Sequence, residues 1–333
     1  MIKVTGLSKR YGTYLAVENV NFSISKGEVI GFLGPNGAGK STIMNILTGY
    51  LSATQGKVEI DGFDIMENPE DAKRRIGYLP EIPPLYIDMT VREYLNFIYD
   101  LKNVKFPKKP HIDEIIKLVK IDNVEKRLIK NLSKGYRQRV GFAQALIGNP
   151  DVLILDEPTV GLDPKQIIEI RNLIARLGKN HTIILSSHIL SEIQAVCERV
   201  IIINKGQIIA DDTAENLSNK LSNDHSVVAR IQCSESEMLE TLKTVRGVKN
   251  VTSMGTKEKG SFDFLIEPKD NVDIRADVYE RVVSRNKTLL SLTSNKLSLE
   301  QIFLRLTEAA NNDEVRRLLG ISDTSESQEK EEN

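Results

Sequence analysis

Short apolar runs, each about the length of a β-strand, recur between residues 27 and 209. Amphipathic segments of helical length separate them, and the runs read EVIGFLG (28–34), VLILDE (152–157), TIILSSH (182–188) and VIIIN (200–204). Strands that are apolar on both faces are typical of a parallel sheet covered by helices on two sides. We therefore predict an α/β core for this part of the chain.

A more helical pattern interrupts this alternation over about residues 84–150. Thr90 and Glu93 have the spacing of a capping box, in which each side chain bonds the other residue's backbone N–H. Apolar residues then follow at helical spacing, namely Val91, Tyr94, Leu95, Ile98 and Leu101. We predict an inserted helical subdomain with one helix beginning directly after Thr90.

After about residue 215 the pattern changes to short strands and short helices in the order strand, helix, strand, strand, helix, strand. This order is that of a small ferredoxin-like α+β unit. The segments are SVVARIQ (226–232), a helix opened by Ser234 with Glu237, KNVTSM (249–254), SFDFLIE (261–267), ADVYERVVSR (276–285) and LLSLTS (289–294), and LSLEQIFLRLTE (297–308) closes the pattern.

These changes divide the chain into a first domain at 1–215, a second at 216–309 and a tail at 310–333. We expect the tail to be disordered. Its last dozen residues, SDTSESQEKEEN, hold five acids and one lysine. A segment with so much like charge and so few apolar residues cannot bury enough surface to fold.

The composition fits a folded protein and excludes several classes of function. Of 333 residues, 27% are charged and 40% are hydrophobic, and the net charge is -1, so no global excess draws the chain to nucleic acid or to an anionic membrane. Cys197 and Cys233 form no disulfide or zinc pattern, and we expect two thiols in a reducing cytosol. The sequence has no secretory signal and no run near the roughly 18 apolar residues of a membrane span. We expect another chain to supply any membrane part.

Residues 34–41, GPNGAGKS, match the P-loop pattern and stand between a predicted strand and a predicted helix, as that motif requires. Glycines let backbone N–H groups surround phosphate oxygens, and the start of the helix adds a positive end. Lys40 can then reach the β- and γ-phosphates, and Ser41 can ligate Mg²⁺. A glycine-rich turn could match by chance, but the flanking elements argue against it. The predicted phosphate-binding residues are Gly34, Pro35, Asn36, Gly37, Ala38, Gly39, Lys40, Ser41 and Thr42.

Two adjacent carboxylates, Asp156 and Glu157, end the apolar run VLIL. Open α/β sheets bind their ligands at the carboxyl ends of strands, so this pair is expected at the same edge as the P-loop. Asp156 can hold Mg²⁺. Glu157, on the other side of the strand, can polarise the attacking water as general base. Such a pair alone is often a solvated turn, but beside a P-loop it predicts a hydrolytic site.

A third motif, LSKGY (132–136), precedes a predicted helix with Ser133 as its N-cap. With the P-loop and the acid pair, it makes residues 1–215 resemble the nucleotide-binding subunit of ATP-binding cassette (ABC) transporters, whose signature is usually LSGGQ. The resemblance implies a P-loop NTPase cassette with a parallel-sheet core, an antiparallel β subdomain and the inserted helical subdomain. It also implies ATP and Mg²⁺ as cofactors.

The resemblance further implies a site made by two chains. In the family, the signature helix binds the γ-phosphate of ATP held on the P-loop of an opposing subunit, so two cassettes enclose two ATP molecules. Ser133 and Gly135 match the signature, and Gly135 stands where backbone must approach phosphate. Lys134 replaces a glycine and Tyr136 replaces a glutamine, so the family pattern is broken at those two side chains.

Four further residues match positions of the family. His188, 31 residues after Glu157, resembles the switch histidine that contacts the γ-phosphate. Asp163 in GLDP resembles the polar contact across the dimer, and an ordinary turn before a helix is compatible with that role. Tyr11 matches the aromatic residue that stacks on adenine, although an isolated tyrosine is more often a packing residue. Glu81 replaces the family's Mg²⁺-sensing glutamine, and we predict that its carboxylate keeps a role at the metal.

Residues 80–95 and 298–307 resemble a bacterial branch of the family with subunits proposed for drug, antibiotic and sodium export and for gliding motility. This implies an ATPase at the cytoplasmic face of the membrane that drives multi-span permease subunits, and the branch implies export. The second ATP-binding subunit would be an identical or a related cassette. Residues 216–309 would then form an accessory domain for dimerisation, regulation or passive packing.

Two other functions fit parts of the pattern. Soluble cassette ATPases act on ribosomes or DNA, but they usually carry two cassettes or a long coiled-coil insertion, whereas one P-loop and one signature occur here. The sequence also has no basic domain, so we predict no nucleic-acid partner. A P-loop kinase would leave the signature and His188 unexplained. The transported substance is not encoded in these motifs, because they recognise ATP.

Overall fold

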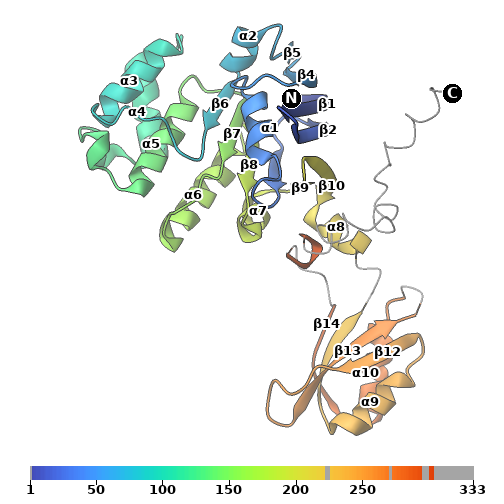
Figure 1. The fold of residues 1–333 in the computed structure, drawn as a ribbon. Coiled ribbons are helices and arrows are strands. Elements are labelled where there is room, and N and C mark those ends of the chain that lie inside the picture. Colours follow the sequence, from blue (N-terminus) through green and yellow to red (C-terminus); the bar gives the residue numbers. More distant parts are fainter. Residues whose placement is uncertain (1, 222–225, 270–271, 295–299, 304–333) are drawn as a thin grey trace, which may run out of the picture. The chain divides into compact units, whose positions relative to one another are not determined.

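The computed structural model describes residues 2–221, 226–269, 272–294 and 300–303 (Figure 1). The predicted tail and most of LSLEQIFLRLTE lie outside these ranges. The described residues fall into two compact units, an N-terminal unit that ends at Ala214 and a C-terminal unit that begins at Glu215. Helix α8 (Ala214–Leu221) begins at the boundary between them.

A mostly parallel six-stranded sheet forms the centre of the N-terminal unit, with the order β10-β9-β3-β8-β7-β6. Its strands are β3 (Val29–Leu33), β6 (Ile76–Leu79), β7 (Val152–Asp156), β8 (Thr182–Ser187), β9 (Arg199–Asn204) and β10 (Gln207–Thr213). The four apolar runs of the sequence are β3, β7, β8 and β9, and they run parallel, so the predicted α/β core is confirmed. The unpredicted β10 returns antiparallel from β9 through a turn at Lys205 and Gly206, both with positive φ.

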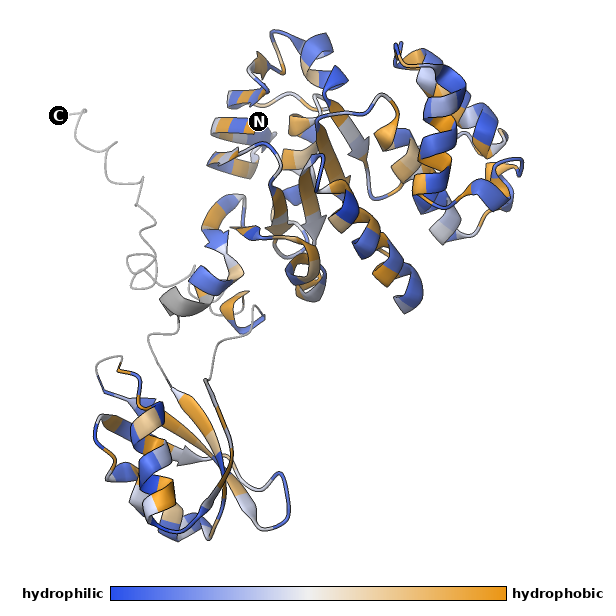
Figure 2. Ribbon diagram, turned by 180° about the vertical axis from the view of Figure 1, so that it is seen from behind, coloured by the Kyte–Doolittle hydropathy of each residue, from blue (hydrophilic) through white to orange (hydrophobic). Residues whose placement is uncertain are grey.

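A second sheet of the N-terminal unit is antiparallel, with the order β2-β1-β4-β5. Its strands are β1 (Ile2–Tyr11), β2 (Tyr14–Ile24), β4 (Gln55–Ile60) and β5 (Phe63–Asp64). Helix α1 (Lys40–Leu47) belongs to the hydrophobic core that joins the two sheets, where its Ile43 and Met44 are buried together with Val4 and Ile154. Figure 2 shows the strands of the six-stranded sheet as largely hydrophobic. This packing fixes the start of α1 at the carboxyl end of β3.

The inserted helical part contains α3 (Val91–Leu101), α4 (Lys108–Leu118) and α5 (Lys134–Leu146). The predicted capping box is present, with the Thr90 N–H donating to Glu93 Oε2 at 2.8 Å and the Glu93 N–H donating to Thr90 Oγ1 at 3.3 Å. Of the five apolar residues at helical spacing, four are buried, whereas Leu101 is 68% exposed at the end of α3. Tyr99 is buried instead, because it lies on the side of α3 that packs against neighbouring helices.

Three further helices complete the unit, namely α2 (Pro69–Arg74), α6 (Pro164–Leu177) and α7 (Leu190–Val196). Side chains of β3 alternate between the two faces of the sheet. Ile30 and Phe32 belong to the core around α1, whereas a Cβ on Gly31 would come within 2.4 Å of Ile193 in α7. Helix α7 therefore packs directly on the backbone of β3, on the face opposite α1.

Gly77 in β6 packs against the backbone of α5 without room for a side chain. An added Cβ would lie 2.2 Å from the carbonyl oxygen of Ala145, and backbone cannot yield as a flexible side chain can. We predict that Gly77→Ala lowers the free energy of unfolding by about 3 kcal/mol, as overpacking does. Denaturant titration measures this loss. In the control Gly62→Ala, with φ +85 and open space around it, the loss should be about 1 kcal/mol, and equal losses would contradict the prediction.

The C-terminal unit is a small α+β fold. Its elements are β11 (Val227–Gln232), α9 (Glu235–Lys243), β12 (Val248–Ser253), β13 (Ser261–Pro268), α10 (Arg275–Ser284) and β14 (Thr288–Ser294). The antiparallel sheet order β12-β13-β11-β14 matches the predicted ferredoxin-like arrangement. Ser234 precedes α9 as predicted, but its side chain makes no capping bond. Glu237 pairs with Lys287 across 3.0 Å instead of completing a box.

No helix in the described ranges combines the length and the hydropathy that a bilayer crossing requires.

Candidate active site

The loop between β3 and α1 wraps around its own lysine. Lys40 is the first residue of α1 and is 6% exposed. Its Nζ donates to the carbonyl oxygens of Gly34 at 2.7 Å and Pro35 at 3.3 Å. Burial lowers the pKa of Lys40, and nearby carboxylates oppose that shift without cancelling it. The loop thus holds a cation among backbone groups, as a phosphate-binding loop must.

A cavity of about 440 Å³ opens beside this loop. Its walls come from five separate parts of the N-terminal unit and include Tyr11, Tyr14, Ala16, residues 36–42, Glu81, Glu157, Val160 and His188. Most of the predicted nucleotide-binding and catalytic residues are therefore neighbours. Gly34 and Pro35 do not line the cavity and instead accept the hydrogen bonds of Lys40.

Glu157 is held between two basic side chains at the edge of this cavity. Its Oε2 forms a hydrogen bond with Nδ1 of His188 at 2.8 Å, and its Oε1 lies 3.9 Å from Nζ of Lys40. Its backbone has φ +47, a left-handed conformation that a glutamate rarely adopts. Strained backbone of this kind is typical of functional sites, where the surrounding structure holds a side chain in place. The carboxylate is thus fixed at the mouth of the P-loop.

Asp156 is turned away from Glu157 and is 4% exposed. It accepts a hydrogen bond from the hydroxyl of Ser186, whose oxygen in turn accepts the N–H of Glu157 at 3.0 Å. Of the three predicted Mg²⁺ ligands, Ser41 and Glu81 line the cavity, whereas Asp156 is not part of its walls. All three offer oxygen atoms, the donors that Mg²⁺ prefers. Their chemistry therefore fits the ion, and their role as ligands stays a prediction.

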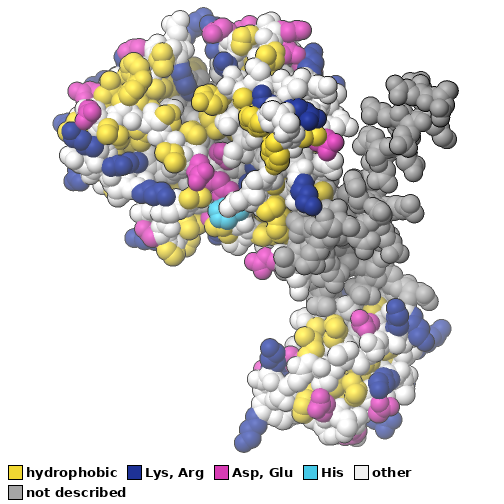
Figure 3. Space-filling view, in the orientation of Figure 1, with side chains coloured by type: hydrophobic (Ala, Val, Ile, Leu, Met, Phe, Trp, Pro, Cys, Tyr) yellow, Lys and Arg dark blue, Asp and Glu magenta, His cyan; other side chains and the backbone are white. Residues whose placement is uncertain are grey.

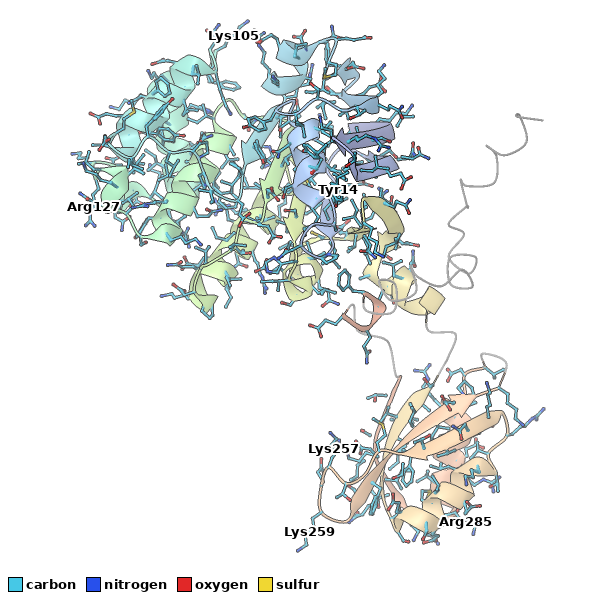
Figure 4. The ribbon with its side chains drawn as sticks, viewed as in Figure 1. Tyr14, Lys105, Arg127, Lys257, Lys259 and Arg285 are labelled. Atoms are coloured by element: carbon cyan, nitrogen blue, oxygen red, sulfur yellow. The ribbon has the colours of Figure 1, made fainter. Side chains whose placement is uncertain are left out.

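Two exposed tyrosines stand at the outer end of the cavity. Tyr11 and Tyr14 face each other across the β1–β2 turn and are 47% and 61% exposed. Tyr14 is labelled in Figure 4. Nζ of Lys9 lies 5.3 Å from the centre of the Tyr11 ring. Sequence reasoning missed Tyr14. The short turn after Tyr11 was the available signal, since residues that flank a tight hairpin turn become cross-strand neighbours.

The signature residues lie at a second cavity, of about 500 Å³, whose walls include Asn123, Gly135, Tyr136, Asp163 and Gln166. Ser133 caps α5 as predicted and accepts the N–H of Tyr136 at 3.5 Å. Asp163 caps α6 and accepts the N–H of Gln166 at 2.9 Å. Within one chain, the structure does not bring Ser133, Gly135 or Asp163 to the P-loop cavity.

Both departures from the signature pattern have local partners. Lys134 reaches over Gly161, where an added Cβ would come within 2.0 Å of the lysine Nζ. Gly161 has φ +71, so a side chain there would be strained as well as blocked. The hydroxyl of Tyr136 accepts a hydrogen bond from Asn123 at 2.8 Å. The two replacements therefore tie α5 to the loop before Asp163 and to a 3₁₀ turn earlier in the chain (Asp122–Val124).

Comparisons with known proteins place the chain in a family. A family model described as ABC transporter matches residues 17–160. The linearmycin resistance ATP-binding protein of Bacillus subtilis (strain 168) is 31% identical over 319 residues, which cover 92% of this chain and 98% of that protein. The chain belongs to the ABC transporter family.

One further relative and one solved structure indicate which subunit of an ABC transporter this chain is. The bacitracin transport ATP-binding protein of Bacillus licheniformis is 41% identical over 222 residues, covering 66% of this chain and 72% of that protein. A solved dimeric ATP-binding cassette, in a post-hydrolysis state with ADP and Pi, has a TM-score of 0.59 and 26% identity over 64% of this chain and 98% of its own. The predicted family and cassette fold are thereby confirmed. The chain is an ATP-binding subunit that hydrolyses ATP to drive transport.

Proposed function

We propose that two copies of this ABC subunit close around two Mg-ATP molecules, each held between the P-loop of one copy and the signature helix of the other. The separation of the two cavities carries this proposal. Lys40 and Glu157 line one cavity, whereas Gly135 and Asp163 line the other. A phosphate-binding helix that does not reach its own P-loop needs a second chain to bring it to the nucleotide. The solved dimeric cassette that this chain resembles supports such a pair.

Each residue of the P-loop cavity has a separate task in this proposal. Glu157 accepts the proton of the attacking water, and its bond to His188 orients the carboxylate. Lys40 neutralises phosphate charge, and His188 contacts the γ-phosphate from the opposite side. Tyr11 stacks on the adenine ring. Ser41, Glu81 and Asp156 would hold Mg²⁺, which supplies positive charge to the β- and γ-phosphates when bound.

A substitution of Glu81 tests the proposed Mg²⁺ binding separately from the other roles at this site. We predict that Glu81→Ala raises the Mg²⁺ concentration for half-maximal ATP turnover about tenfold, the lower end of losses seen when partners of a metal site are removed. A Mg²⁺ titration of ATPase activity measures this. Glu81→Gln, which keeps an oxygen donor at the same place, is the control and should stay close to the unchanged protein. If Glu81→Ala left both Mg²⁺ dependence and turnover unchanged, Glu81 would have no part in metal binding.

Hydrolysis then reopens the two copies and moves membrane subunits bound to them. We assign residues 1–215 to the cassette and residues 216–309 to an accessory domain. We also propose that the subunit lies at the cytoplasmic face of the membrane, where it binds multi-span permease subunits. Relatives named for bacitracin transport and linearmycin resistance support export of an antibiotic-like compound. On the face drawn in Figure 3, acidic and basic side chains are interspersed. We infer no nucleic-acid partner from the net charge of -1 and the lack of a basic domain.

Co-purification tests the proposed function directly. The chain is tagged in its native cell, membranes are extracted gently in Mg-ATP, and the proteins that co-purify are identified by mass spectrometry. We expect a stoichiometric multi-span membrane protein, whose cavity would then identify the substrate class. Recovery only in the soluble fraction, with ribosomal or DNA-bound partners, would overturn the transport role and leave the ATPase chemistry intact.

A further inference from the structure

A buried carboxylate lies behind the active site, at the start of α7. Glu192 is 2% exposed, and within the described ranges no basic side chain stands at ion-pair distance from it. Its Oε2 accepts hydrogen bonds from the hydroxyls of Thr159 at 2.6 Å and Ser187 at 2.9 Å. Two neutral hydroxyls are weak compensation for an acid removed from water.

The second oxygen of this carboxylate adds to the cost of burying it. Oε1 of Glu192 is buried, and no group in the described part of the chain donates a hydrogen bond to it. An unsatisfied buried oxygen destabilises a fold, so its presence in a native site needs an explanation other than stability. An apolar side chain would fill the same space without that cost. The carboxylate is therefore present for what it joins.

The two hydroxyls belong to different segments that both leave the sheet at the active site. Thr159 follows β7 and lies two residues after Glu157, whereas Ser187 ends β8 immediately before His188. Ser187 is held further by the N–H of Ile189, which donates to its hydroxyl oxygen at 3.0 Å. A single oxygen of Glu192 thus fastens together the loop behind Glu157 and the turn that carries His188.

We propose that Glu192 is a positioning residue that keeps Glu157 and His188 in register. The inference rests on the roles proposed above for those two residues. Their own bond, 2.8 Å between His188 Nδ1 and Glu157 Oε2, spans two loops that have no ladder hydrogen bonds of their own. Beside the bond from the Glu157 N–H to the Ser186 hydroxyl, Glu192 supplies a second connection between the two segments. It does not line the nucleotide cavity.

Turnover and affinity separate this role from nucleotide binding. Glu192→Ala is expected to lower kcat for ATP by about 10- to 100-fold, as small misplacement of reacting groups does, with ATP affinity unchanged. Glu192→Gln is expected to stay within about threefold of the unchanged protein, because an amide oxygen accepts the same two hydrogen bonds. Gln194→Ala, an exposed residue of the same helix, is the control for general effects on α7 and should change neither quantity.

A double variant and hydrogen exchange test the connection itself. Thr159→Val removes one hydroxyl at nearly constant shape, and adding it to Glu192→Ala should reduce kcat no further, because both changes break the same link. Both single variants should speed amide exchange in residues 158–163 and 187–190, while Gln194→Ala should not. Thr159→Val also keeps the test decisive if Glu192→Ala does not fold.

Two results would overturn the inference. One is a normal kcat in Glu192→Ala or Thr159→Val. The other is a loss of kcat in Glu192→Gln as large as that in Glu192→Ala, with amide exchange unchanged in residues 158–163 and 187–190. Glu157→Gln is assayed in parallel, so that the two proposals can fail separately. An inactive Glu157→Gln beside a fully active Glu192→Ala would reject only the positioning role, whereas an active Glu157→Gln would reject the proposed base.

Discussion

Replacing Glu157 with glutamine is expected to lower the rate of ATP hydrolysis by about 10²- to 10⁴-fold, the contribution of a general base. The amide has nearly the shape of the carboxylate but cannot accept the proton of water. Its oxygen can still accept a hydrogen bond from His188, and Lys40 keeps its contacts with the P-loop carbonyls. Binding of ATP should therefore survive when turnover is lost.

Steady-state phosphate release and equilibrium ATP binding measure the two effects separately. Because the nucleotide remains intact, the Glu157→Gln protein should also accumulate as an ATP-dependent dimer in size-exclusion chromatography. Glu198→Gln, the same change at an exposed position between α7 and β9, serves as the control and should hydrolyse ATP normally. Near-normal hydrolysis by Glu157→Gln would remove Glu157 from the mechanism.

Lys40→Met is expected to weaken Mg-ATP binding by about 100-fold, since hydrogen bonds to charged groups contribute about 1.5–3 kcal/mol each. The ammonium is the buried cation of the P-loop, and methionine replaces it with an apolar chain of similar length. The substitution also removes the cation 3.9 Å from Glu157. Hydrolysis should fall with binding, in contrast to Glu157→Gln.

Calorimetric titration with ATP in Mg²⁺ measures the loss of affinity. Thermal unfolding without nucleotide should change little, because burial already disfavours the Lys40 charge and lowers its pKa. Lys26→Met removes an exposed lysine from the same unit and should leave ATP affinity as it was. Unchanged affinity in Lys40→Met would show that the P-loop lysine does not contact phosphate.

Local sequence patterns predicted the sheet, the P-loop, the capping box at Thr90 and the ferredoxin-like order, because each depends on residues near one another in the chain. The misses depend on distant partners. The capping bond expected at Ser234 is absent, and the side chain of Glu237, which would complete the capping box, bonds Lys287, 50 residues away. Glu192 gave no signal, since its partners Thr159 and Ser187 reach it only after β7 and β8 align.

The same limit applies to the candidate site. The motifs indicated which residues belong near a nucleotide, and the fold groups Tyr11, Lys40, Glu81, Glu157 and His188 around one cavity. No pattern could show that the backbone of Glu157 is strained or that Lys134 covers Gly161. Both features result from tertiary packing rather than from the order of residues.

The separation of the P-loop and signature cavities also has a genetic consequence. If two identical copies pair as proposed, a defect at Lys40 would disable the site on the altered chain's own P-loop, whereas a defect at Gly135 would disable the site on its neighbour's P-loop. Consider a mixed pair in which one chain carries the Lys40 defect and the other carries the Gly135 defect. One of its two sites combines both defects. The other site combines the intact P-loop of one chain with the intact signature of its partner, because each site is shared between opposite copies. Two alleles that are each inactive alone would therefore restore one working site in each mixed pair when expressed together.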